Sequence, residues 1–285
     1  MTMVEHRMKL ILGLITALLV SFARMEQTLA QQSAAAAPNG EPKKPQAEAT
    51  LFPVPDFTAD IWQRAKLTGD WFGLRTKMAN NGVQLDLDNV HTFQDVASGG
   101  LDTTARYLGN AEVVLKLDSH KMGLWPGGFL LVRGEAPFGT GVNAATGALL
   151  PVNTRPILSS PARDEMVLSH VVLTQFLHEK FAIALGKLDT SGGDANEFAH
   201  GRGDEKFMNL AFSLNPVVLR TVPYSALGMG MVFLPTKDAI VTFSAIDTEG
   251  ITTRTGFDTL FKRYDFGVGG SLDGQAFRTH RSPVN

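Results

Sequence analysis

The sequence contains no cysteine, so no disulfide bond can stabilise its fold. It also lacks an excess of either charge, since 26 basic residues stand beside 28 acidic ones and the formal net charge is -2 at pH 7. Such a balance offers no basic surface for nucleic acid, which we exclude as a partner. Beyond residue 30, no apolar run is long enough for a transmembrane helix. If the chain crosses a membrane, it must therefore do so with β-strands.

Catalytic motifs are absent as well. The 7 His show no spacing typical of metal ligands, and Gly228-Met229-Gly230 lacks the third glycine and the following helix of a dinucleotide-binding loop. Asp86 and Asp88 could act as an acid–base pair, but side chains two residues apart on a strand simply share a face. The sequence therefore predicts a protein that is not an enzyme and has neither a cofactor nor a metal.

The first thirty residues have the pattern of a signal peptide. Arg7 and Lys9 precede an apolar run from Leu10 to Ala23, and Thr28-Leu29-Ala30 offers small residues for cleavage before Gln31. The run is shorter than the ~20 apolar residues of a membrane-spanning helix. Residues 31–66 follow, and their composition, which is rich in Ala, Pro, Gln and Lys at the start, predicts a flexible leader.

A short amphipathic helix is expected after the leader. Asp70 can cap its start, apolar residues follow at helical spacing, and Asn81-Gly82 can end it. After Gly82 the spacing of apolar residues changes to two, as in Val83, Leu85 and Leu87, which is typical of a strand with one apolar and one polar face.

Similar alternating segments recur along the chain. We expect about eight strands, each near the ~9–11 residues that cross a bilayer when tilted. The recognisable segments are 83–88, 107–118, 129–136, 167–177, 181–189, 227–234 and 239–247. Two long connections rich in Gly and Pro, 137–163 and 190–223, alternate with short turns, as they do in outer-membrane barrels.

The segment LTGDWFGLRTKMANNGV, residues 67–83, resembles the N-terminal signature of the OprB-type carbohydrate-selective porins. Further blocks resemble the family in the same order: GLWPGGFLLVRGE at 123–135, PVNT at 151–154, GKLD at 186–189, FAHG at 198–201, KFMNLAF at 206–212, NP at 215–216 and PYSALG at 223–228. The resemblance covers residues 67–261. It implies an all-β fold, a transmembrane antiparallel barrel of about sixteen strands, which passes small sugars such as glucose by facilitated diffusion.

The resemblance also implies a location and partners. The location is the outer membrane, reached by export through the periplasm. The partners are small sugars, outer-membrane lipid and the barrel-assembly machinery. The oligomeric state is either a monomer or a homo-trimer.

After Phe261 we find no clear strand alternation and no similarity to the family. We therefore predict an aberrant tail at 262–285, of the kind that a frameshift and premature stop would produce, on about the first half of a larger barrel. Two alternatives follow. A truncated porin fragment with open sheet edges would be non-functional in lipid, or the chain could be a soluble periplasmic β-protein that binds sugar.

A sugar channel needs donors and acceptors for hydroxyl groups and binding weak enough for release. In the expected register the inward charged residues are Asp86, Glu112, Lys116, Arg133, Glu135, Lys187 and Asp189. Arg133 with Glu135 is the first candidate pair, because a planar guanidinium can hold paired oxygens. The loop 194–215 is expected to fold inward and to add Glu197, His200, Arg202, Asp204 and Lys206. Each of these groups could equally serve only to solvate the lumen or the surface.

Overall fold

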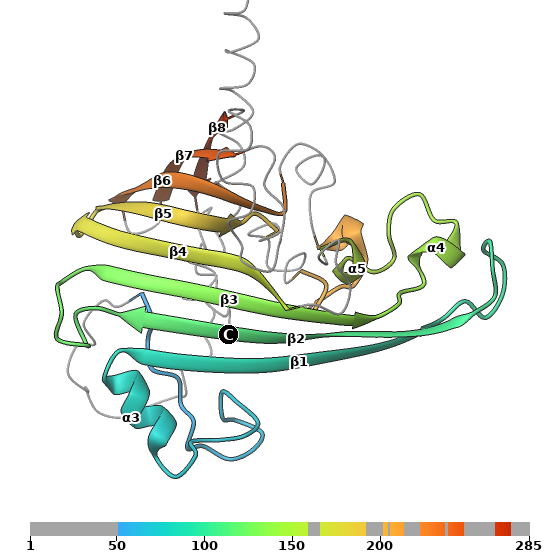
Figure 1. The fold of residues 1–285 in the computed structure, drawn as a ribbon, viewed down its shortest axis with the longest axis horizontal. Helices are drawn as coiled ribbons and strands as arrows, with labels where there is room; N and C mark the ends of the chain where they lie inside the picture. Colours follow the sequence, from blue (N-terminus) through green and yellow to red (C-terminus); the bar gives the residue numbers. More distant parts are fainter. Residues whose placement is uncertain are drawn as a thin grey trace, which may run out of the picture.

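The computed structural model describes residues 51–158, 166–191, 202–204, 206–213, 223–236, 239–247 and 266–274. Eight strands form one antiparallel sheet whose spatial order follows the sequence from β1 to β8 (Figure 1). The all-β expectation is confirmed. The strands are β1 Val83–Asp95, β2 Ala105–Asp118, β3 Gly128–Gly139, β4 Val167–His178, β5 Phe181–Asp189, β6 Ser225–Thr236, β7 Ala239–Asp247 and β8 Phe266–Gly274.

Helical structure is sparse in the described ranges. The helices are α3 Leu74–Asn80, α4 Asn143–Thr146, α5 Arg155–Leu158 and the short 3-10 helix η1 Leu210–Phe212. None of the helices in the described part of the chain is long and apolar enough to cross a membrane.

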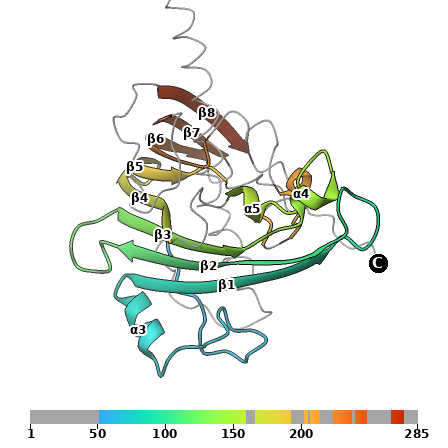
Figure 2. The same ribbon diagram turned by 45° about the vertical axis from the view of Figure 1, so that its right-hand side comes forward.

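The connections between strands differ at the two ends of the sheet. At one end, which we call the short-turn end, β2 joins β3 through 119–127 and β4 joins β5 through 179–180. At the other, the long-loop end, 140–166 and 190–224 connect the strands and contain α4, α5 and η1. Figures 1 and 2 show α3 near the left-hand ends of β1–β3 and α4 near their right-hand ends. The predicted alternation of long and short connections is therefore confirmed.

Helix α3 starts later than the sequence predicted. Trp71, Phe72 and Gly73 have φ values of 49°, 60° and 90°, which lie in the left-handed region and cannot continue a right-handed helix. The predicted helix start directly after Asp70 is therefore wrong, because Gly73 precedes the helix. The Asp70 carboxylate nevertheless caps the first turn, since it accepts hydrogen bonds from the backbone N–H and the hydroxyl of Thr76, at 2.7 and 2.8 Å. The predicted helix end at Asn81-Gly82 is confirmed.

Two further expectations need correction. The expectation that no strand follows Phe261 is wrong, because β8 pairs with β7. Asp247 lies opposite Phe266 at one end of this pair, and Ala239 lies opposite Gly274 at the other. In this segment Phe266, Val268 and Leu272 fit the period of two of a strand, but the glycines among them obscure the apolar pattern. In addition, part of the predicted flexible leader packs against the sheet, since Leu51 and Phe52 form a buried cluster with Phe129 of β3.

One face of the sheet carries large exposed apolar side chains, and we call it the apolar face. Leu173 lies opposite Leu185, which lies opposite Met229, and Met231 lies opposite Phe243. These five side chains are between 40% and 57% exposed although they form a continuous row across four strands. Such a surface in a monomeric protein marks contact with another apolar phase or partner.

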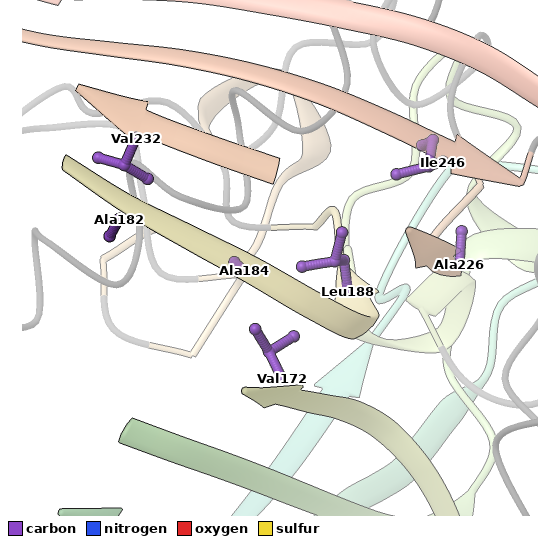
Figure 3. Packing of buried hydrophobic residues seen from close by; sticks show 7 residues of the cluster. All are labelled: Val172, Ala182, Ala184, Leu188, Ala226, Val232 and Ile246. Atoms are coloured by element: carbon purple, nitrogen blue, oxygen red, sulfur yellow. The ribbon is translucent and has the colours of Figure 1, made fainter. Parts of the chain in front are cut away.

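The opposite face, which we call the inner face, carries small or polar buried side chains. Across β4–β7 its apolar part is a cluster of mostly small residues: Val172, Ala182, Ala184, Leu188, Ala226, Val232 and Ile246 (Figure 3). Thr174, Thr242 and Ser244 are buried on the same strands. The side-chain alternation thus separates bulky apolar residues on one face from compact and polar residues on the other.

Candidate functional site

The candidate site is a cluster of acidic and basic side chains on the inner face. Glu112 on β2 lies directly opposite Glu135 on β3, so the two carboxylates share this face. Arg133 belongs to the same face because it is two residues from Glu135. Two neighbouring carboxylates repel each other, so the arrangement is stable only if cations lie between them.

Arg133 bridges β2 and β5. Its Nη1 lies 2.7 Å from Oδ2 of Asp189, and its Nε lies 3.3 Å from Oε1 of Glu112. The strand register brings these three residues together across about half the sheet. Glu135, which the sequence suggested as the companion of Arg133, pairs with two other arginines instead.

Arg202 is the centre of the cluster. Its guanidinium lies 2.6 Å from Glu135, 3.4 Å from Glu112 and 3.4 Å from Asp189. Burial alone would lower the pKa of Arg202, but the carboxylates of Asp189 and Glu135 raise it well above its usual value. Arg202 therefore remains a cation and neutralises acids from three strands.

Arg155, at the start of α5, adds a third guanidinium. Its Nη1 lies 3.6 Å from Glu135, its Nε donates to Asp204 at 3.1 Å, and its Nη2 also pairs with Asp204. Burial raises the pKa of Asp204 above its usual value, although Arg155 acts in the opposite direction. This pair ties residues 202–204 to the connection that contains α5.

Tyr224 completes the cluster from the residue before β6. Its hydroxyl donates to Oε2 of Glu135 at 2.8 Å and accepts a hydrogen bond from Arg202. Burial, which outweighs the opposing effect of Arg202, raises the pKa of the Tyr224 phenol well above its usual value. The phenol therefore stays protonated and can donate.

We call this set the inner charge cluster: Glu112, Arg133, Glu135, Arg155, Asp189, Arg202, Asp204 and Tyr224. It contains three guanidinium groups and four carboxylates, so its formal charge is close to balanced. Arg155 and Tyr224 were not among the residues that the sequence suggested, although both adjoin or belong to the blocks at 151–154 and 223–228. Only the folded contacts identify their role.

The other suggested residues lie elsewhere. Asp86 pairs with Lys116 at 2.9 Å and with Arg75 and Lys66 at 3.6 Å, in a second group of charges near the start of β1. Lys187 is buried on β5. His200 lies outside the described residues, whereas Arg202 and Asp204 from the same loop lie against the inner face, as expected for an inward fold.

Asn110 is a buried polar residue beside the cluster. It lies on β2 two residues from Glu112 and is 1% exposed, and neither atom of its side-chain amide has a hydrogen-bond partner among the residues that the structure describes. Across the described ranges, no group of three or more His, Asp or Glu side chains is placed to hold a metal ion. The side chains of the inner charge cluster offer hydrogen-bond donors and acceptors.

A sequence model of the family "Carbohydrate-selective porin, OprB family" matches residues 102–281. The chain belongs to this family. The match continues past Phe261, where the sequence predicted that the resemblance ends, and it includes β8. No curated protein sequence matches the chain.

Two solved structures are similar to the chain. The chain is similar to the high-pH structure of Pseudomonas putida OprB, with 21% identity and a TM-score of 0.51. The match covers 64% of this chain and 44% of that chain, so the present chain spans less than half of that porin. The low-pH structure of the same protein matches at 16% identity and a TM-score of 0.34, over 64% of this chain and 50% of that chain. The sheet thus has the fold of the porin barrel wall.

Proposed function

We propose that this chain acts in the outer membrane as a channel for small sugars such as glucose, by facilitated diffusion and without catalysis. The observation that carries the proposal is the division of one sheet into an apolar face and an inner face with balanced charges. The chain would reach the outer membrane by export through the periplasm and would be inserted by the barrel-assembly machinery. A homo-trimer is one oligomeric state to test.

The apolar face supports contact with lipid. Leu87 on β1 and the row from Leu173 to Met229 are exposed, as expected for the outward side of a membrane strand. Towards the long-loop end, the rings of His91, Tyr107 and Phe138 contact one another with centroids 5.6 to 6.1 Å apart. Amphipathic aromatic residues are enriched at the interface between lipid and water.

The inner charge cluster supports contact with sugar. Arg133, Glu112 and Asp204 have side chains that are 18%, 17% and 17% exposed, whereas those of Arg155 and Arg202 are only 6% and 4% exposed. The more exposed group supplies guanidinium donors and carboxylate acceptors for hydroxyls, and the buried group holds it in place. Because the charges are nearly balanced, the surface favours neutral polar solutes and binds them weakly enough for release.

Glucose-dependent block of single-channel current in planar bilayers tests this assignment. We expect Arg133→Gln to weaken the block about tenfold, since a hydrogen bond to a charged group contributes about 1.5–3 kcal/mol. Lys77→Gln, which removes the same charge from the exposed surface of α3, is the matched control. Equal block in both variants would remove Arg133 from the sugar path.

Two observations bear on the alternatives. β1 and β8 lie at the two edges of the described sheet, and a non-conducting fragment is the alternative in which such edges would stay unpaired in lipid, at a cost in free energy. A soluble periplasmic sugar-binding protein would have to cover the apolar face. Recovery in the periplasmic extract instead of the outer membrane would favour the soluble protein, and outer-membrane recovery without any conductance would favour the fragment.

A further inference from the structure

Residues 51–53 lie against the inner face, and we call residues 51–57 the strap. Leu51, Phe52 and Phe57 are 8%, 6% and 4% exposed. Pro53 and Pro55 restrict the backbone and remove two N–H donors, so the segment offers mainly carbonyl groups for hydrogen bonding. The strap therefore needs donors from the sheet to fix it.

The sheet provides these donors at the short-turn end. Nε2 of Gln84, at the start of β1, donates to the carbonyl of Phe52 at 2.9 Å and to that of Pro53 at 3.1 Å. Nζ of Lys121, in the turn after β2, donates to the same Phe52 carbonyl at 3.4 Å. Gln84 is itself buried, so its amide depends on these contacts for hydrogen bonding.

An aromatic chain anchors the other side of the strap. The ring of Phe52 meets that of Phe129 edge to face at 5.5 Å, and Phe129 meets Phe176 in the same way at 5.8 Å. Leu51 packs in the same cluster, with Leu131 at its margin. Such edge-to-face pairs fix ring orientation as well as burying apolar surface.

The strap and the inner charge cluster share one face. Leu131 is two residues from Arg133, and Gln84 lies opposite Lys116, which is four residues from Glu112 on β2. Phe129 and Glu135 are six positions apart on β3, which corresponds to about 20 Å along the strand. Figure 1 shows the blue segment before α3 near the left-hand ends of β1–β3, and α4 near their right-hand ends. The strap therefore crosses the inner face well away from the cluster, at the opposite end.

We propose that the strap is a constriction of the channel, separate from the inner charge cluster, which sets the size limit for sugars at the short-turn end. This inference rests on the proposed function. A segment laid on a sheet adds a layer about 10 Å thick, comparable to the spacing of packed sheets, and thus narrows any passage along the inner face. The inner charge cluster selects by hydroxyl chemistry, and the strap selects by size.

Liposome swelling with the full chain tests the proposal, using glucose and a trisaccharide as solutes. Phe52→Ala with Gln84→Ala removes the ring anchor and the main donor. We expect the trisaccharide-to-glucose rate ratio to rise severalfold, because the freed strap leaves a wider passage. Phe72→Ala removes an exposed ring outside the strap and is the matched control, with an unchanged ratio.

A second variant tests the same idea without loosening the fold. The chain has no cysteine, so Val54→Cys creates a single reactive thiol in the strap. A bulky thiol reagent at this position should slow both sugars, whereas the same reagent at Asn80→Cys on α3 should not. If the parent chain passes glucose but neither strap variant alters size selection or flux, the strap proposal is wrong and the proposed function stands. If the parent passes no sugar, both are wrong.

Discussion

Arg202 interacts with carboxylates from three strands although it is 3% exposed. Its backbone has a φ of 58°, an unfavourable value for a residue with a side chain, which the ion pairs stabilise. Nothing local in the sequence distinguishes it from other loop arginines. Its position at the centre of the cluster follows only from the fold.

We expect Arg202→Ala to lower the free energy of unfolding by about 3–5 kcal/mol, because it leaves buried carboxylates without their cation. Urea unfolding in detergent, followed by heat-modifiable gel mobility, measures the change. Lys77→Ala, on the exposed surface of α3, should change it by about 0.5 kcal/mol or less. A similar small change for Arg202→Ala would contradict its central role.

Asp204 should make the stability depend on pH. Burial raises its pKa above the usual 3.8, so folding favours the protonated form. Protonated Asp204 therefore contributes fully to the free energy of unfolding below pH 3.8. This contribution is lost as the pH rises through the raised pKa of Asp204 in the folded protein. Asp204→Asn keeps a neutral side chain, so the variant should match the parent at low pH and exceed its stability at pH 7. A variant that is less stable at pH 7 would show that the pair with Arg155 outweighs burial.

At the scale of elements, the alternating segments located the first seven strands because each has one apolar face. The alternation did not reveal β8, because glycines obscure the period of two that Phe266, Val268 and Leu272 keep in this segment. The start of α3 was also mistaken, because local spacing carries no sign of the left-handed residues before Leu74. Once the strands are located, their register places Glu112 and Arg133 together. The contacts of Arg155 and Tyr224 with Glu135 cannot be predicted in this way, because they depend on how the loops fold back onto the sheet.

Two glycines that flank α3 provide a matched pair. Gly82 and Gly73 have φ values of +83° and +90°, so alanine is strained at both. A Cβ at Gly82 would lie 2.5 Å from the carbonyl oxygen of Asp118, whereas at Gly73 nothing lies within 4 Å. Gly73→Ala should cost about 1 kcal/mol from backbone strain, and Gly82→Ala should cost distinctly more. Equal unfolding free energies would show that α3 does not approach the end of β2 so closely.

For the molecule as a whole, the apolar face should contact lipid. Met231 lies in the middle of β6, and Met231→Arg should lower the stability in lipid vesicles by about 2–4 kcal/mol, as expected for a cation at the bilayer midplane. Leu149→Arg, at a fully exposed residue in the connection before α5, should have little effect. If both substitutions are tolerated equally, the apolar face is not in lipid.

The proposed function depends on one activity, the passage of sugar through a membrane by this chain. The most direct measurement is glucose entry into liposomes that contain the chain as their only protein. We predict that glucose enters much faster than it enters protein-free liposomes, and that net flux stops when the glucose concentrations inside and outside are equal. Entry no faster than in protein-free liposomes, with the chain folded in the membrane, would contradict it.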